Sequence, residues 1–225
     1  MKLLLDCADM AEIKEAYGIF PLDGVTTNPS ILARTGRPPY EVLGEIRDFI
    51  GSEAELHVQV VSEDAAGMIK EADRIGDELG SSTYVKIPVT SEGLRAMKKL
   101  HKDGVRITGT AVYTAMQAFL AAKAGASYVA PYVNRIDNLG SDGIVTARNI
   151  QTILTQNDCH AEILAASFKN AQQVLALCTC GIGAATLAPS VLKSLVQLDA
   201  VTMAVKTFRT DFETLCGQGR DMSNI

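Results

Sequence analysis

Residues 83–102, which read TYVKIPVTSEGLRAMKKLHK, contain one complete unit of the pattern that decides the fold. The first part, 83–89, is short, rich in β-branched residues and nearly continuous in hydrophobicity, which indicates a buried parallel strand. The second part, 90–102, has apolar residues three and four positions apart, as an amphipathic helix does. Thr90 stands where an N-cap is expected. The stretch therefore predicts a strand followed directly by a helix.

The same alternation continues along the whole chain. Helix-like segments such as 63–79 separate the strand-like runs, and Gly104 and Gly125 stand at changes from helix to strand, where a left-handed residue is common. Eight such units in 225 residues predict one (β/α)8 TIM barrel. No G-x-G-x-x-G follows the first run, which argues against a dinucleotide-binding sheet. The other strand-like runs are 2–6, 24–28, 55–60, 105–112, 128–133, 161–167 and 184–189.

The composition excludes several classes of protein. A formal net charge of -5 offers no basic face for nucleic acid or for an anionic membrane. No apolar run approaches the roughly 20 residues of a membrane span, and the apolar start of the chain stops at Asp6, too early for a secretion signal. Five cysteines without a CxxC pair are typical of reduced thiols, so we expect a cytoplasmic protein. Cys178 and Cys180 have no neighbouring histidine, and no metal site is expected.

The barrel should occupy residues 1–216, including a C-terminal helix, and residues 217–225 should form a polar, mobile tail. Glycine and polar residues dominate this last segment, which follows the final helix-like pattern.

Polar residues alternate with apolar ones in the predicted strands. Residues two apart share a face of a strand, and the partner face is aliphatic, for example at Val85 and Ile87. Buried polar groups are costly unless they are paired or used, and barrel enzymes place their sites at the carboxyl ends of strands. The pattern therefore predicts a polar site. Its members are Asp6, Thr26, Asn28, His57, Gln59, Tyr84, Lys86, Thr108, Thr110, Tyr132 and Asn134, with Ser167 and Lys169 beyond the seventh strand.

Lys86 is the most informative residue of this set, because lysine is rarely buried without a partner or a function. A desolvated amine has a lowered pKa and can attack a carbonyl to form an imine. Alternatively, Lys86 is paired with a carboxylate such as Asp6, and its position alone leaves both interpretations open. Tyr132, Thr110 and Gln59 could hold a water molecule and transfer protons, or each could be an ordinary hydrogen-bonded core residue.

A second polar group lies beyond the sixth and seventh strands. Arg135, Ser167 and Lys169 would suit a phosphate oxyanion, although Arg135 by itself could be a surface arginine. No pair of carboxylates suggests glycoside hydrolysis.

Five motifs stand out along the chain, namely Gly24-Val-Thr-Thr-Asn-Pro-Ser30, Val85-Lys-Ile-Pro-Val-Thr90, Gly109-Thr-Ala-Val112, Tyr128-Val-Ala-Pro-Tyr-Val-Asn-Arg135 and Ala165-Ala-Ser-Phe-Lys169. Taken together and in this order, they resemble those of the transaldolase family, and in particular its small bacterial branch, which includes fructose-6-phosphate aldolase. The resemblance covers essentially the whole chain.

The resemblance implies a barrel enzyme that forms a Schiff base on Lys86 and needs neither a metal nor an organic cofactor. It assigns acid/base work to Asp6, and it implies a homo-oligomer, pentamer or decamer, whose C-terminal helix packs on a neighbour. Its substrates would be sugar phosphates and small ketoses or aldehydes. It also implies that Asn28, with Thr26 in the same motif, contacts the imine intermediate and that Thr110 binds the catalytic water. Arg135, Ser167 and Lys169 would bind the phosphate.

Two positions separate activities within the family. Gln59 and Tyr132 match the aldolase pattern, whereas transaldolases typically carry Glu and Phe there. The leading hypothesis is therefore reversible cleavage of fructose 6-phosphate to dihydroxyacetone and glyceraldehyde 3-phosphate. The alternatives are a transaldolase that transfers dihydroxyacetone between sugar phosphates in the pentose phosphate pathway, and a non-catalytic sugar-phosphate-binding barrel.

Overall fold

The computed structural model describes residues 1–225 and contains a closed barrel of eight parallel strands. Each strand pairs with the next, and β8 pairs with β1 to close the barrel. This confirms the predicted (β/α)8 architecture. The strands are β1 (Lys2–Asp6), β2 (Gly24–Thr26), β3 (Glu55–Gln59), β4 (Tyr84–Pro88), β5 (Ile107–Val112), β6 (Tyr128–Pro131), β7 (Glu162–Ala165) and β8 (Ala184–Leu187).

Several strands end before the predicted carboxyl boundary. The run 24–28 leaves the sheet after Thr26, and Asn28 becomes the N-cap of a helix, with Oδ1 accepting a hydrogen bond from the Ile31 amide at 3.0 Å. The run 128–133 ends at Pro131, and a helix begins at Val133 without a side-chain capping bond from Tyr132. At Asn28, local capping thus competes with strand pairing at the rim of the barrel.

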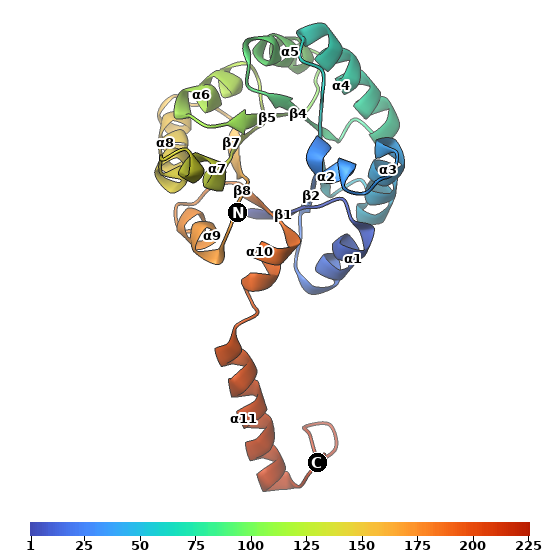
Figure 1. The fold of residues 1–225 in the computed structure, drawn as a ribbon, viewed down its shortest axis with the longest axis vertical. Coiled ribbons are helices and arrows are strands. Elements are labelled where there is room, and N and C mark those ends of the chain that lie inside the picture. The colour runs from blue at the N-terminus through green and yellow to red at the C-terminus, as the bar shows by residue number, and fades with distance from the viewer.

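Helices surround the barrel as a ring (Figure 1). The predicted helices 63–79 and 90–102 are present, and Thr90 caps the second by accepting from the Gly93 amide at 3.0 Å. Gly104 and Gly125 have φ values of 80° and 98°, as expected of left-handed residues. The ring consists of α1 (Met10–Ile19), α3 (Pro39–Ile50), α4 (Ala65–Leu79), α5 (Ser91–Lys102), α6 (Ala115–Lys123), α8 (Gly143–Gln156), α9 (Ala171–Cys178) and α10 (Pro189–Ser194).

Two short additional helices lie at the carboxyl ends of strands. They are α2 (Pro29–Ala33) after β2 and α7 (Val133–Asn138) after β6. Since β2 and β6 are four strands apart in a closed barrel of eight, the two helices lie on opposite sides of its opening, as Figure 1 shows.

The predicted division of strand faces is confirmed. The aliphatic face packs in the main hydrophobic core between the strands and the helices, where Val85 and Ile87 are almost completely buried. The alternate positions face the inside of the barrel, where Leu4, Tyr128, Leu164 and Ala184 form a separate small cluster. The polar positions do not form one site, however, because they divide between the two ends of the barrel.

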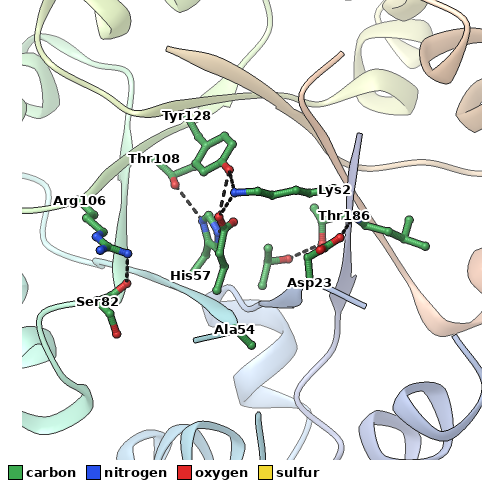
Figure 2. A network of polar contacts seen from close by, with 12 residues as sticks. Lys2, Asp23, Ala54, His57, Ser82, Arg106, Thr108, Tyr128 and Thr186 are labelled. Atoms are coloured by element: carbon green, nitrogen blue, oxygen red, sulfur yellow. Dashed lines mark hydrogen bonds and ion pairs between the residues drawn. The ribbon is translucent and has the colours of Figure 1, made fainter. Parts of the chain in front are cut away.

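A polar network occupies the amino-terminal end. Glu55 accepts hydrogen bonds from Lys2 and from the Tyr128 hydroxyl, and it also contacts His57 Nε2 at 3.2 Å. His57 Nδ1 lies 2.9 Å from the Thr108 hydroxyl. Figure 2 shows Lys2, His57, Thr108 and Tyr128 pointing toward one another. His57 and Thr108 therefore belong to a satisfied structural network, and so does Tyr84, whose ring stacks on His57.

Burial sets the ionisation of this network. It lowers the pKa of His57 to about 4, although the hydrogen bond to Glu55 acts in the opposite direction. Burial also acts to raise the pKa of Glu55, but the hydrogen bonds from His57 and Lys2 outweigh it and hold the value at about 2. At neutral pH the network therefore contains a neutral imidazole and an ionised carboxylate.

This ionisation predicts a loss of stability in acid. Between pH 6.5 and about 4, the unfolded chain binds a proton at His57 that the folded chain does not bind. The free energy of unfolding therefore decreases as the pH is lowered through this range. We expect His57 to contribute about 2 kcal/mol to the drop between pH 7 and pH 4.5. Urea unfolding at both pH values measures the drop, which should be smaller in His57→Gln. An equal drop in both proteins would contradict this account.

The helix α11 (Asp199–Cys216) extends away from the barrel (Figure 1), and none of its residues is buried. It ends at Cys216, and residues 217–225 follow it with two turns. That this tail is mobile stays a prediction. No helix in the structure is both long enough and apolar enough to cross a membrane.

Candidate functional site

A cavity of about 640 Å³ opens at the carboxyl end of the barrel. Of the ten residues for which a catalytic or substrate-binding role was predicted, seven line it, namely Asp6, Asn28, Gln59, Lys86, Tyr132, Arg135 and Ser167. Thr26 and Thr110 are fully buried and hydrogen-bond to lining residues. Lys169 is exposed and lies outside the lining.

Lys86 projects from β4 into this cavity and is only 5% exposed. Its Nζ donates a hydrogen bond of 2.7 Å to the carbonyl oxygen of Thr27. No carboxylate oxygen lies within 4.0 Å of Lys86 Nζ, which is the distance of an ion pair. The structure therefore does not support an ion pair between Lys86 and Asp6. Burial lowers the pKa of Lys86, Asp6 opposes this, and Arg135 adds to it. The amine is therefore biased toward its neutral, nucleophilic form.

Asp6 is held at the end of β1 by a chain of hydroxyl groups. Thr26 Oγ1 donates to Asp6 Oδ1 at 2.7 Å and lies 2.7 Å from Thr186 Oγ1. Because a hydroxyl has a single proton, Thr186 donates to Thr26. Burial raises the pKa of Asp6, although the charge of Lys86 and the hydrogen bond from Thr26 act against it. A carboxyl group with a raised pKa is suited to accept and return protons.

Tyr132 lies on the other side of the cavity, where its hydroxyl is 2.9 Å from Thr110 Oγ1. Thr110 stands at an irregularity of the sheet, since the pairing of β5 with β6 shifts register after Gly109 and Ala111 has a φ of 56°. Tyr113 packs edge-on against the Tyr132 ring. The structure thus brings together Tyr132 and Thr110, two of the three residues for which proton transfer was considered.

Arg135 and Ser167 lie at the mouth of the cavity. Arg135, in α7, stacks its guanidinium 4.6 Å from the centre of the Tyr132 ring and has no carboxylate partner within 4.0 Å. Ser167 has a φ of 61°, and its carbonyl accepts a hydrogen bond from the Asn134 amide at 2.9 Å, which joins its loop to α7. An unpaired guanidinium beside a hydroxyl can bind an anion.

The sequence model of one protein family, described as Transaldolase/Fructose-6-phosphate aldolase, matches residues 3–224. The chain belongs to this family. It is therefore an aldolase-type enzyme of the lyase or transferase kind, and its cavity lies where the family's barrel should carry its active site.

Two solved structures share the fold of this family member. One is a structure of native KDPGal, 15% identical, with a TM-score of 0.57 over 83% of this chain and 82% of the other. The second is a cube-shaped, highly porous protein cage designed by fusing symmetric oligomeric domains. It is 14% identical, with a TM-score of 0.60 over 97% of this chain and 79% of that one. At these identities the likeness concerns the barrel alone.

Among the residues in or near the cavity that were not predicted, Thr186 and Arg34 bear on the hydrogen bonding and charge around Asp6. Thr186 follows the alternation of the other strands, since it stands two residues after Ala184 in β8, and the same rule applied to β8 would have found it. Arg34 also lines the cavity, at the C-cap of α2. No pattern in the sequence distinguishes it from an ordinary surface arginine.

Proposed function

We propose that this family member is a class I aldolase that reversibly cleaves fructose 6-phosphate to dihydroxyacetone and glyceraldehyde 3-phosphate through a Schiff base on Lys86. The observation that carries the proposal is a buried lysine without a carboxylate partner that faces a polar cavity. A barrel that only bound sugar phosphates would have no use for such a lysine, which is costly to bury.

The reaction begins when the neutral Lys86 amine attacks C2 of the open-chain ketose. Loss of water then leaves a protonated imine. Asp6 faces the same cavity and takes the proton of the C4 hydroxyl, which breaks the C3–C4 bond and releases the aldehyde. The electrons of that bond remain on the three-carbon fragment as an enamine. Protonation of C3 and addition of water then release dihydroxyacetone and restore the lysine.

The hydroxyl pair Tyr132 and Thr110 supplies the later proton transfers. The two hydroxyls, which lie 2.9 Å apart, can bind a water molecule beside them and deliver a proton to the enamine. Gln59 lines the same cavity and assists in placing that water. Asn28 lies near the imine, because it follows the Thr27 carbonyl that the Lys86 amine contacts.

The phosphate of the substrate binds at the mouth of the cavity. Arg135 provides the charge and Ser167 a hydroxyl. Lys169, exposed just beyond them, attracts the phosphate from solvent rather than contacting the reacting carbons.

The second candidate is transfer of dihydroxyacetone to another sugar phosphate, because the family contains transaldolases. The two candidates differ in the fate of the enamine. The Tyr132 hydroxyl, with its Thr110 partner, favours protonation and release.

The deciding assay measures glyceraldehyde 3-phosphate formed from fructose 6-phosphate with and without erythrose 4-phosphate. We expect cleavage without the acceptor at a substantial rate. Strict dependence on the acceptor would establish the transaldolase alternative. Borohydride reduction in the presence of fructose 6-phosphate should trap the three-carbon adduct on the peptide that contains Lys86, and no adduct would favour a binding protein.

We also propose that the protein is a cytoplasmic homo-oligomer of five or ten chains, whose mass in solution would show the number directly. The support is the family resemblance together with α11, none of whose residues is buried and which carries several large, exposed apolar side chains. They are Val201, Met203, Val205, Phe208 and Leu215. All five cysteines are free, in keeping with a reducing compartment.

A further inference from the structure

The hydroxyl of Thr186 lies close to the cavity but outside its lining, and the proposed mechanism gives it no role. Thr186 belongs to β8 and is only 3% exposed. Its Oγ1 contacts Thr26 Oγ1 at 2.7 Å, and Thr26 donates to Asp6 Oδ1 at 2.7 Å. Since β8 and β2 flank β1, three neighbouring strands supply one chain of hydroxyl and carboxylate groups.

This chain of hydrogen bonds runs in one direction. Thr186 Oγ1 has no hydrogen-bond partner other than Thr26. If Thr26 donated to Thr186, the proton of the Thr186 hydroxyl would be buried without an acceptor, which is unfavourable. Thr186 therefore donates to Thr26, and the Thr26 proton is directed to Asp6 Oδ1.

The two carboxylate oxygens of Asp6 consequently differ. Oδ1 accepts from Thr26, which is completely buried. Oδ2 has no hydrogen-bond partner in the protein, and it does not belong to the buried polar atoms that lack one, which are Tyr17 Oη and Arg47 Nε. Oδ2 is therefore the oxygen that is accessible from the cavity that Asp6 lines.

Charged groups surround Asp6, but Thr186 is neutral. Burial raises the pKa of Asp6, whereas the charge of Lys86 on β4 and the hydrogen bond from Thr26 lower it, and so do the charges of Arg135 and Arg34. A substitution of Thr186 leaves all these charges in place, so its effect on Asp6 reports the hydrogen bonds alone. The other titratable groups that line the cavity are Cys7, Asp9, Glu12 and Tyr132.

We infer that Thr186 is a positioning residue that acts through Thr26 to keep Asp6 Oδ1 as an acceptor and to leave proton transfer to Oδ2. The inference rests on the proposed function for the step in which Asp6 is the base. In that step the C4 O–H bond breaks, and its proton binds to Oδ2. The O–H electrons form the aldehyde carbonyl, and those of the C3–C4 bond pass to the enamine. Successive hydrogen bonds strengthen one another, so donation by Thr186 stabilises the ionised form of Asp6.

The first test measures the ionisation of Asp6 without substrate. Carbon-13 NMR of enzyme labelled at its aspartate carboxyl groups follows the titration, and Asp6→Asn assigns the signal. We expect Thr186→Val to move the midpoint upward by about half a pH unit, because the ionised form loses stabilisation. Thr186→Ser keeps the hydroxyl and should titrate like the parent. An unchanged midpoint in Thr186→Val, or the same shift in Thr186→Ser, would overturn the inference.

A further variant covers the case in which Thr186→Val does not fold. The thiol of Thr186→Cys is a weaker donor than a hydroxyl, so this variant should shift the midpoint in the same direction by a smaller amount. A midpoint equal to that of the parent would then count against a role for Thr186.

The second test measures kcat for fructose 6-phosphate as a function of pH. Asp6 must be ionised to accept a proton, so kcat falls as the pH drops through its titration. Thr186→Val should move this acid limb to higher pH and lower kcat about threefold to tenfold with little change in KM, and Thr186→Ser should restore both. Thr83→Val is the matched control, because Thr83 is also 3% exposed but donates to the Leu79 carbonyl, away from the cavity. It should lower stability without moving the limb.

A double-mutant cycle shows whether Thr186 acts through Thr26. In a Thr26→Val background, Thr186→Val should move the acid limb no further, whereas additive shifts would contradict the inference. If the parent does not cleave fructose 6-phosphate, the proposed function fails, and the NMR titration still decides whether Thr186 controls Asp6. If the parent cleaves the sugar and Thr186→Val titrates as the parent does, only the role of Thr186 is wrong.

Discussion

Lys86→Ala is expected to abolish turnover while the barrel remains folded. Without the amine no imine forms, so kcat/KM for fructose 6-phosphate should fall by at least about 10⁴-fold. The fold should survive, because Lys86 makes a single hydrogen bond, to the Thr27 carbonyl, and no ion pair. Losing that bond costs about 1 kcal/mol. Kinetics, borohydride trapping followed by mass spectrometry, and thermal unfolding measure the three effects.

Two further variants make this result specific. Lys86→Met keeps most of the buried volume without the amine, and it should be as inactive as the alanine variant but more stable. Lys102→Ala, on the exposed end of α5, should keep both activity and adduct. An adduct that persists in Lys86→Ala would show that another lysine forms the imine.

Tyr132→Phe is expected to change the enzyme from cleavage toward transfer. In the proposed mechanism the Tyr132 hydroxyl, which lies 2.9 Å from Thr110 Oγ1, protonates the enamine, and removing a general acid typically costs about 10²-fold or more. Cleavage of fructose 6-phosphate alone should therefore fall by about this factor. Transfer to erythrose 4-phosphate should fall much less, because the acceptor then consumes the enamine without that proton.

The ratio of the two rates, measured on the same preparation, separates this effect from general damage to the site. Tyr113→Phe is the matched control, since Tyr113 packs against the Tyr132 ring but its hydroxyl has no hydrogen-bond partner in the structure. It should leave the ratio unchanged. If Tyr132→Phe cleaves fructose 6-phosphate as fast as the parent, the tyrosine does not protonate the enamine.

Much of the fold could be predicted from local pattern. The alternation in residues 83–102 predicted β4 and α5 together with the Thr90 cap, because strand and helix periods and caps depend on neighbouring residues. The carboxyl ends of strands were less predictable. At Asn28 the choice between continuing a strand and capping a helix depends on whether a partner strand extends that far.

The candidate site was only partly predictable. The alternation of side chains along a strand shows which face a residue occupies, but it does not show how far along the barrel axis the residue lies. His57 and Gln59 share a face, yet the first belongs to the closed network with Glu55 and the second lines the cavity. At the rim of the barrel, too, the sequence did not show which residues line the cavity, as Lys169 and Arg34 illustrate. Lys169 was expected near the phosphate and lies outside the lining, whereas Arg34 was not expected and lines it.

By itself, the sequence determined the eight strand–helix units, the polar inner face of the strands and the presence of a lysine among them, because these follow from periods of two and 3.6 residues. Only the tertiary structure decided that Lys86 has the Thr27 carbonyl rather than Asp6 as its partner. It alone also placed Arg34 opposite Arg135. The reason is physical: burial, ion pairing and the direction of approach depend on which strands become neighbours when the sheet closes.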